Sequence, residues 1–487
     1  MSTPLSVPLN LYASSVKVLD ALPPRPPSLP VQDPTKSFWL DPEDNPLAKE
    51  GSTGFLGRDD IDICIIGSGI TGISALWHIV KDAKARKSEK SLKIMILEAR
   101  DFSSGATGRN GGHLLPNPFI GFISRQLAHG GAEAIKSFEF ENKCTQDILE
   151  FIKQERIASE VDLVQGGHVM LLFSGEEEAS TKADYDAAVK AGMKLEDIEW
   201  IERPVVERRY GAPYQAVKSS AYNLWPAKLV TALYNASKKI ASESGAVEIF
   251  LHTSAPVTST LSGPDGKTVV NTPRGTVKTK YVLHATNAYA AYLLPDLYGP
   301  GGIIPTRGQV IATRHAVGNG TEKDGEMRKL SWDGNDGFEY WFPRPRGSTS
   351  KYSNETPLFI LGGGREIPAG FETHVSDDST CNKEVGEGLR KFLDSVFVGS
   401  GKGSVEREWT GIMGFTVTGD PFVGPVLSKT PVTHKGHYVA AGYTGHGMPR
   451  AFSCGEIISS MILADLDGKP WEKPDWFPES YLTWNKK

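Results

Sequence analysis

Short apolar runs alternate with longer segments of helical periodicity along most of the chain. Residues 61–66 (IDICII) and 93–98 (KIMILE) are β-branched or aliphatic runs with the length of strands buried on both faces. Between them, apolar positions have helical spacing over 72–84, and a polar connection follows at 85–91. This order of strand, helix and strand predicts a βαβ unit whose two strands are parallel.

The rest of the pattern predicts further elements in two groups. Helical periodicity recurs at 134–157, 176–191, 226–244 and 453–465. Apolar runs predict strands at 169–173, 247–251, 269–271, 281–284, 303–313, 338–342, 358–361 and 438–441. We therefore expect an α/β fold, a Rossmann-like nucleotide-binding domain with an inserted mixed β-sheet (α+β) substrate domain. The expected segments are 59–160, 215–295 and 405–487 for the first domain, and 161–214 and 296–404 for the second.

The first 58 residues differ in composition from the remainder. Eight prolines occur in the 24 residues from Pro23 to Pro46, and proline fixes φ and removes a backbone donor. An extended proline-rich arm over 1–58 is expected. Phe38, Trp39 and Leu40 are expected to clamp this arm onto the body, and a protein-docking motif is the alternative interpretation.

Net charge, apolar runs and cysteine spacing limit which partners and which compartment we expect. Lysine and arginine (53) against aspartate and glutamate (58) give a net charge of −5, which favours neither nucleic acid nor an anionic membrane. No apolar run approaches the roughly 18 residues of a membrane span, and the first residues do not resemble a signal peptide. The four cysteines form no CxxC pair. We expect a cytoplasmic protein without a metal site, and its oligomeric state is left open.

Glycine is over-represented, and one glycine cluster has a specific context. The chain has 51 glycines in 487 residues, whereas average usage is about 7 %. Residues 67–72 read GSGITG, a GxGxxG motif that follows a predicted strand and precedes a predicted helix. Such glycines allow a tight turn, close approach to a pyrophosphate and close helix packing. Glu98, at the end of the next strand, is expected to accept hydrogen bonds from an adenosine ribose. NAD and FAD both remain alternatives at this point.

Four further motifs occur along the chain, at 104–113 (SGATGRNGGH), 285–289 (ATNAY), 409–416 (WTGIMGFT) and 442–447 (GYTGHG). Together with 67–72 and Glu98, they make residues 60–466 resemble the D-amino-acid-oxidase-like (DAO) family of FAD-dependent oxidoreductases. Within that family, the chain is similar to the amine-oxidising branch that includes sarcosine oxidase and γ-glutamylputrescine oxidase.

The resemblance implies an FAD site. Its expected residues are Gly67, Gly69, Ile70, Thr71, Gly72, Glu98, Ala99, Arg100, Ser104, Gly105, Thr107, Arg109, Asn110, Gly111, Gly112, His113, Val257, Ala285, Thr286, Gly442, Gly445, His446 and Gly447. For His446 the alternative is a structural histidine beside the cofactor. Arg109 and Met413 stand where relatives have a flavin-linked histidine or cysteine, so the FAD is expected to be non-covalent.

The resemblance also implies the reaction. It is the oxidation of an amine or amino acid by hydride transfer to flavin N5, which gives an imine and then a carbonyl product, with O2 reduced to H2O2. The expected catalytic residues are Arg109, His113, Tyr340 and Arg365. The alternatives are an FAD-dependent dehydrogenase with another acceptor, an NAD-dependent dehydrogenase, and a flavin-containing binding or assembly protein without oxidase turnover.

Recognition of a substrate carboxylate has several candidate residues. Sarcosine-oxidase-like proteins place a lysine just after the GHG element, where this chain has Pro449 and then Arg450. Small N-methyl amino acids are therefore doubtful substrates. Arg344, Arg346 and Arg365 lie in the predicted second sheet, and a guanidinium group binds carboxylates in a bidentate manner. A solvated surface charge is the alternative for each of the three.

Overall fold

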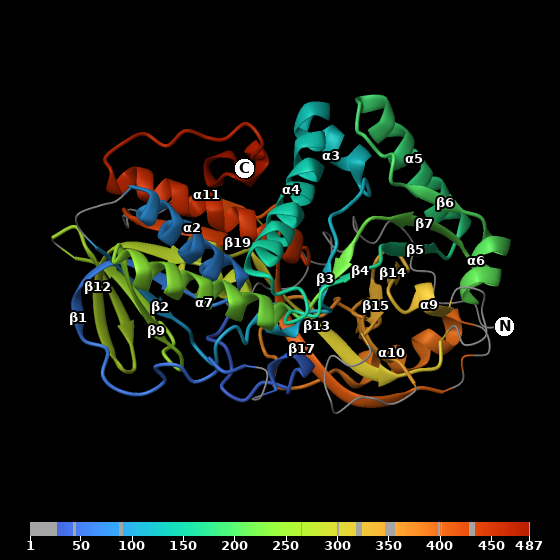
Figure 1. The fold of residues 1–487 in the computed structure, drawn as a ribbon, viewed down its shortest axis with the longest axis horizontal. Coiled ribbons are helices and arrows are strands. Elements are labelled where there is room, and N and C mark those ends of the chain that lie inside the picture. The colour runs from blue at the N-terminus through green and yellow to red at the C-terminus, as the bar shows by residue number, and fades with distance from the viewer. Residues whose placement is uncertain are drawn as a thin grey trace.

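Two large sheets lie along the long axis of the molecule (Figure 1). The computed structural model describes residues 27–41, 45–86, 91–263, 265–299, 301–317, 324–345, 356–397, 400, 402–427 and 434–486. The first part of the expected arm, 1–26, and the candidate Arg346 lie outside the described residues.

The first sheet has a parallel centre. Its strands follow the order β10-β11-β12-β1-β2-β9, and β19 and β18 continue from β12. The neighbours β9, β2, β1, β12 and β19 are parallel. The strands are β1 (Arg58–Ile66), β2 (Leu92–Leu97), β9 (Val247–His252), β10 (Ser259–Ser262), β11 (Thr268–Thr272), β12 (Gly275–His284), β18 (Phe422–Pro425) and β19 (His437–Ala441).

The second sheet is mixed. Its order is β17-β13-β16-β15-β14-β5-β7-β6, and only the β14–β5 pair among these described strands is parallel. The strands are β5 (His168–Leu172), β6 (Glu199–Ile201), β7 (Gln215–Ser219), β13 (Ile304–Arg314), β14 (Ser331–Gly334), β15 (Glu339–Pro343), β16 (Leu358–Gly363) and β17 (Ser404–Phe415). β7 and most of β17 lie in segments that we expected in the nucleotide-binding domain, and the domain division stays a prediction.

Helices cover both sheets, and a small sheet joins them. The helices are α2 (Ile70–Arg86), α3 (Phe122–His129), α4 (Gly131–Glu155), α5 (Gly175–Ala191), α6 (Arg203–Tyr210), α7 (Pro226–Ser244), α8 (Ala290–Leu293), α9 (Asp324–Met327), α10 (Lys383–Val396) and α11 (Met448–Leu466). The small sheet contains β3 (His113–Leu114), β8 (Tyr222–Asn223) and β4 (Val164–Gln165). Short 3-10 helices include η1 (Phe38–Leu40), η2 (Ala106–Arg109) and η3 (Asn287–Tyr289).

Strand β1 shows why the first sheet is buried on both faces. Ile63 and Ile65 pack in one cluster with residues of α2, α7 and α11. Cys64 and Ile66 alternate with them and pack in another cluster on the opposite face, as the period of a strand requires. In Figure 1 the three helices lie together along this sheet. The predicted α/β fold with a βαβ unit and a second mixed sheet is confirmed.

The described part of the arm is anchored by aromatic side chains. Phe38 and Trp39 in η1 are buried, and each ring centroid lies 5.4 Å from that of Trp225. The Trp39 indole N–H donates to the Asn110 carbonyl at 2.6 Å, and the Trp225 indole N–H donates to the Trp39 carbonyl at 2.9 Å. These contacts clamp the arm onto the body, as the sequence suggested.

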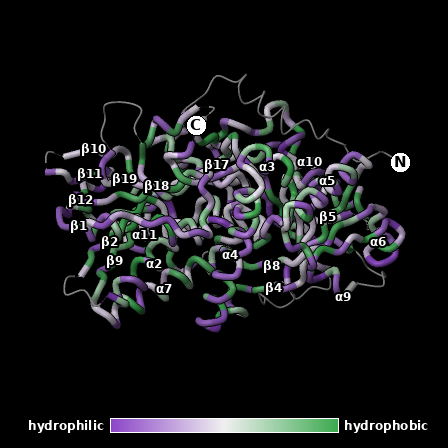
Figure 2. Tube along the Cα trace, turned by 90° about the horizontal axis from the view of Figure 1, so that it is seen from above, coloured by the Kyte–Doolittle hydropathy of each residue, from purple (hydrophilic) through white to green (hydrophobic). Residues whose placement is uncertain are grey.

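Hydrophobic residues gather toward the interior of the molecule, whereas the outlying helix α6 is largely hydrophilic (Figure 2). Within the described residues, no helix has the length and apolar character needed to cross a bilayer.

Candidate cofactor and substrate site

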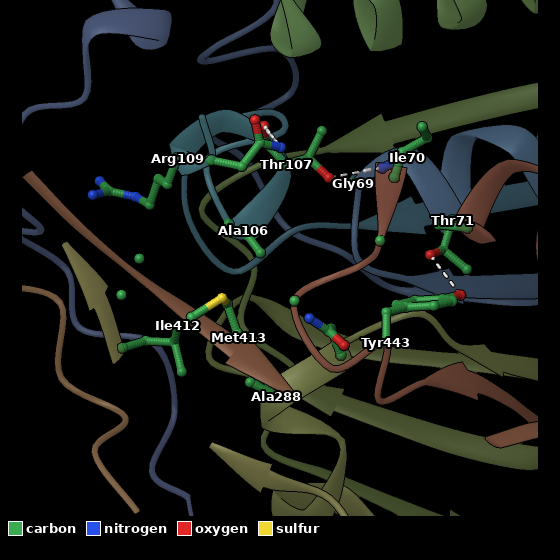
Figure 3. Close-up of a pocket in the computed structure, with 18 of the residues that line it drawn as sticks. Gly69, Ile70, Thr71, Ala106, Thr107, Arg109, Ala288, Ile412, Met413 and Tyr443 are labelled. Atoms are coloured by element: carbon green, nitrogen blue, oxygen red, sulfur yellow. Dashed lines mark hydrogen bonds between the residues drawn. The ribbon is translucent and has the colours of Figure 1, made fainter. Parts of the chain in front are cut away.

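A cavity of about 390 Å³ is lined by residues of both sheets, and Figure 3 shows part of it. It collects segments that are far apart in the sequence. The predicted FAD residues that line it are Gly67, Gly69, Ile70, Thr71, Glu98, Ala99, Arg100, Gly105, Thr107, Arg109, Asn110, Gly111, His113, Val257, Ala285, Thr286, Gly445, His446 and Gly447. Tyr340 and Arg365, two predicted catalytic residues, line the same cavity.

Four predicted FAD residues do not line this cavity: Gly72, Ser104, Gly112 and Gly442. A Cβ atom at Gly72 would lie 2.2 Å from the Gly67 carbonyl oxygen and 3.0 Å from Ile65 Cγ2. Gly72 therefore allows α2 to pack closely on β1, which is the role expected for the third glycine of the motif. Gly112 lies against the Trp39 ring, so it supports the cavity wall from behind.

The glycine turn after β1 is held in place by its neighbours. Gly67 has φ +108°, and a Cβ there would lie 2.6 Å from the Ala285 carbonyl oxygen. Glu98 Oε2 accepts hydrogen bonds from the Ser68 backbone N–H (3.0 Å) and hydroxyl (2.8 Å). Thr107 Oγ1 accepts from the first N–H of α2 at 3.1 Å (Figure 3). A preformed backbone cradle with a carboxylate at the end of β2 fits the ADP half of a dinucleotide.

Arg109 is tied into the protein interior. Its Nε donates to the Ser104 carbonyl (2.9 Å), its Nη1 to the Thr410 carbonyl (2.7 Å) and its Nη2 to the Thr35 carbonyl (2.8 Å). Asp378 Oδ2 lies 3.4 Å from Nε. Burial lowers the pKa of Arg109 to about 10, so it remains charged at neutral pH. Figure 3 shows the side chain extending away from the other labelled residues. Its expected catalytic role stays a prediction that this geometry does not favour.

Tyr340 of β15 is wedged between two glycines. A Cβ at Gly111 would lie 2.4 Å from Tyr340 Cε2, and one at Gly362 would lie 2.4 Å from its Cζ. Glycine at 362, in the Gly-Gly-Gly cluster before Arg365, thus makes room for an aromatic ring on the neighbouring strand. Burial raises the pKa of Tyr340 to about 12, so its phenol is neutral at physiological pH.

His113 lies beside that ring and is also neutral. Its ring centroid is 5.5 Å from Tyr340 and 5.3 Å from Phe342, both in edge-on contacts. Burial lowers the pKa of His113 to about 3. A cationic His113 is therefore not available near pH 7, and any part it takes in catalysis uses the neutral imidazole.

Arg365 lies in the cavity wall between two aromatic rings. Its guanidinium carbon lies 4.9 Å from the Phe338 ring centroid and 4.8 Å from that of Phe415. No other described residue makes an ion pair or hydrogen bond with it. A guanidinium held between two rings at a cavity wall, without an internal anion, can bind a carboxylate.

The other candidate arginines have internal partners. Arg344 is buried, forms an ion pair with Asp162 and stacks over Trp39 at 5.1 Å. The interpretation of Arg344 as a solvated surface charge is wrong. Arg450 is buried too, and its Nε donates to Glu141 Oε1 at 2.7 Å.

Glu141 of α4 also faces His446. The His446 Nδ1 lies 3.2 Å from Glu141 Oε2. Burial alone would raise the pKa of Glu141, but Arg450 and His446 beside it hold this pKa at about 2. His446 thus lines the cavity while a buried carboxylate orients its ring, so both interpretations of this residue have a structural basis.

The sequence interpretation missed two polar residues in the cavity wall, Asp333 and His168. His168 Nδ1 lies 2.9 Å from Ser331 Oγ, and its Nε2 lies 3.2 Å from Asp333 Oδ1. Neither residue belongs to a recognisable motif. Strand pairing brings them together, because β14, which contains Asp333, pairs with β5, which contains His168, and with β15. The arm was missed as well, since its residues 28–30 line the cavity.

One cavity is lined by the glycine turn after β1 and by residues of the second sheet, an arrangement that fits a dinucleotide cofactor beside a substrate. The family model for FAD dependent oxidoreductases (DAO) matches residues 62–461. The chain belongs to this family, which confirms the resemblance and makes the protein an FAD-dependent oxidoreductase.

The chain is similar in sequence to curated relatives and similar in fold to solved structures. The chain is 24% identical to "Gamma-glutamylputrescine oxidoreductase" of Escherichia coli (strain K12), over 83% of this chain and 84% of the relative. It is 21% identical to "Probable oxidoreductase OrdL" of Rhizobium meliloti (strain 1021), over 84% of each. Glycine oxidase from Geobacillus kaustophilus has a similar fold, with a TM-score of 0.62 and 17% identity over 87% of this chain and 98% of that one. L-proline dehydrogenase from P. horikoshii also has a TM-score of 0.62 and 17% identity, over 88% of this chain and 98% of that one.

Proposed function

We propose that the protein is a cytoplasmic FAD-dependent oxidase of amines or amino acids whose small-molecule substrate has a carboxylate group. The observation that supports this most is Arg365, a cation in the cavity wall without an anionic partner among the described residues. The relative named for γ-glutamylputrescine and the similar fold named for glycine oxidase support an amine or amino acid as the compound oxidised.

FAD is held non-covalently in this proposal. The glycine turn at 67–72 and Glu98 bind the ADP half, and the 105–113 loop with the 445–447 segment faces the flavin. Met413 lines the cavity where some relatives have a linking cysteine, and a thioether does not form such a bond. When bound, FAD accepts a hydride from the substrate and passes the electron pair to O2, which becomes H2O2.

The residues of the chain bind and desolvate the substrate. Arg365 holds the carboxylate, while Phe338, Phe415 and Tyr340 exclude water around it. The substrate nitrogen must be neutral, because its lone pair stabilises the positive charge that develops as the neighbouring carbon loses hydride. The C–H bond breaks, a C=N bond forms, and water then converts the imine to a carbonyl compound and an amine or ammonia.

The first prediction is that purified protein is yellow and that its absorbance near about 450 nm bleaches when an amine or amino-acid substrate is added without oxygen. Readmitting O2 should restore the colour and release one H2O2 per flavin. Colour that returns only with an added electron acceptor would identify a dehydrogenase. A protein that neither contains nor takes up FAD would contradict the proposal, as would failure of a broad amine panel to bleach the flavin.

The second prediction concerns Arg365→Met. For substrates with a carboxylate, kcat/KM should fall about 10- to 100-fold, because charge-assisted hydrogen bonds contribute about 1.5–3 kcal/mol. Steady-state kinetics on matched amines with and without the carboxylate measures this, and FAD content should stay unchanged. Arg390→Met is the control, since Arg390 is partly exposed, pairs with Glu408 and does not line the cavity. An equal loss on both kinds of amine would show that Arg365 does not bind the carboxylate.

A further inference from the structure

Two opposite charges line the cavity without pairing with each other. Asp333 comes from β14, and Arg365 follows the end of β16. Among the described residues no ion pair joins them, and none of these residues is an anionic partner of Arg365. The Asp333 side chain is 19% exposed, so its carboxylate is only partly screened by solvent.

Strand register places Asp333 directly beside Tyr340, and Arg365 follows the end of the strand on the other side of β15. Asp333 is paired with Tyr340, and Tyr340 is paired with Gly362. Directly paired residues in antiparallel strands direct their side chains to the same face, and Asp333 and Tyr340 both line the cavity. β15 lies between β14 and β16. Asp333 on β14 and Arg365 just after β16 thus reach the same cavity from the two strands that flank Tyr340.

Two imidazoles lie near Asp333. His168 is 4% exposed, with Nδ1 against the Ser331 hydroxyl and Nε2 3.2 Å from Asp333 Oδ1. His113, whose ring centroid is 6.4 Å from that of His168, is neutral because of its burial. No lysine or arginine among the described residues pairs with Asp333.

Resting on the proposed function, we propose that Asp333 is a subsite for a second, cationic amino group of the substrate that is not itself oxidised. A carboxylate beside an amine stabilises its protonated form, and a protonated nitrogen cannot assist hydride loss from its neighbouring carbon. The subsite thus suits a nitrogen that keeps its charge. The substrate class is a carboxylate with two amino groups, one oxidised and one held by Asp333.

The test uses the holoenzyme and racemic amino acids in matched pairs: ornithine against norvaline, and lysine against norleucine. Each pair differs by the distal amino group. The third prediction is that the wild type prefers the diamino member in kcat/KM, and that Asp333→Asn lowers kcat/KM for it about 10- to 100-fold, chiefly through KM. The same variant should leave the neutral member within about twofold. Asp336→Asn is the control, because Asp336 is an exposed carboxylate of the same hairpin outside the cavity wall.

Binding without turnover gives a second measurement. Titration of oxidised holoenzyme with 5-aminovalerate should perturb the flavin spectrum, and Asp333→Asn should weaken that binding more than the binding of valerate. Equal effects of Asp333→Asn on both members of each pair, or no preference for diamino substrates, would overturn the subsite while amine oxidation stands. If no amine reduces the flavin, the proposed function fails and the subsite fails with it.

Discussion

Replacement of Gly69 by alanine is expected to remove FAD from the protein without unfolding it. A Cβ at Gly69 meets only the Thr107 side chain, at 3.1 Å, and the backbone there needs no positive φ. The Thr107 side chain must shift by a few tenths of an ångström to make room for the methyl group, and we expect the fold to survive this change. Gly69 lines the cavity at the start of α2, where the second glycine of the motif allows a pyrophosphate to approach the backbone. We expect FAD affinity to fall about 10²-fold, because charge-assisted hydrogen bonds to phosphate contribute about 1.5–3 kcal/mol each.

Flavin content per folded protein, followed by absorbance together with circular dichroism, measures this effect. Gly175→Ala is the matched control, since Gly175 begins α5 with nothing within 4 Å of an added Cβ and lies outside the cavity wall. It should keep full FAD content. If Gly69→Ala bound FAD as tightly as the wild type, the pyrophosphate would not lie against this turn.

The nucleotide half of the fold was predictable because its signals are local. The run at 61–66, the glycines at 67–72 and Glu98 lie within one βαβ unit, so each part gives the other its context. The helix predicted over 226–244 was found with those bounds as α7, where proline at its first turn marks the start. Local propensity, pattern and motif agree in this part of the chain.

The substrate side was less predictable because it is assembled across strands. Gly111 and Gly362 are 251 positions apart, yet both lie against the ring of Tyr340. Asp333 lies at the site because it pairs with Tyr340 on the neighbouring strand. β17 was identified as a motif at 409–416 and not as a strand of the second sheet, where it pairs with β13 along its whole length. Arg109 shows the same limit, because its internal partners at Thr35, Asp378 and Thr410 come from three distant segments.

Replacement of Trp39 by alanine is expected to destabilise the protein and to release FAD. Trp39 is completely buried, its indole N–H donates to the Asn110 carbonyl, and its carbonyl accepts from Trp225. Removing a large buried aromatic side chain costs about 3–5 kcal/mol. Since Asn110 belongs to the glycine-rich loop that lines the cavity, losing this hydrogen bond affects the cofactor site as well as the core. The thermal midpoint of the holoenzyme should fall, and FAD should dissociate faster by about tenfold or more.

Two variants separate these contributions. Trp39→Phe keeps an aromatic ring but removes the N–H, so it should accelerate FAD release with a smaller loss of stability. Trp484→Ala makes the same chemical change at a tryptophan that is 45% exposed. It should change the free energy of unfolding by less than about 1 kcal/mol and leave the rate of FAD release unchanged. If Trp39→Ala released FAD no faster than Trp484→Ala, the arm would stabilise the body without supporting the loop at 105–113. Faster release together with an intact secondary structure would make the arm part of the cofactor site, because the Trp39 indole hydrogen bond joins η1 to that loop.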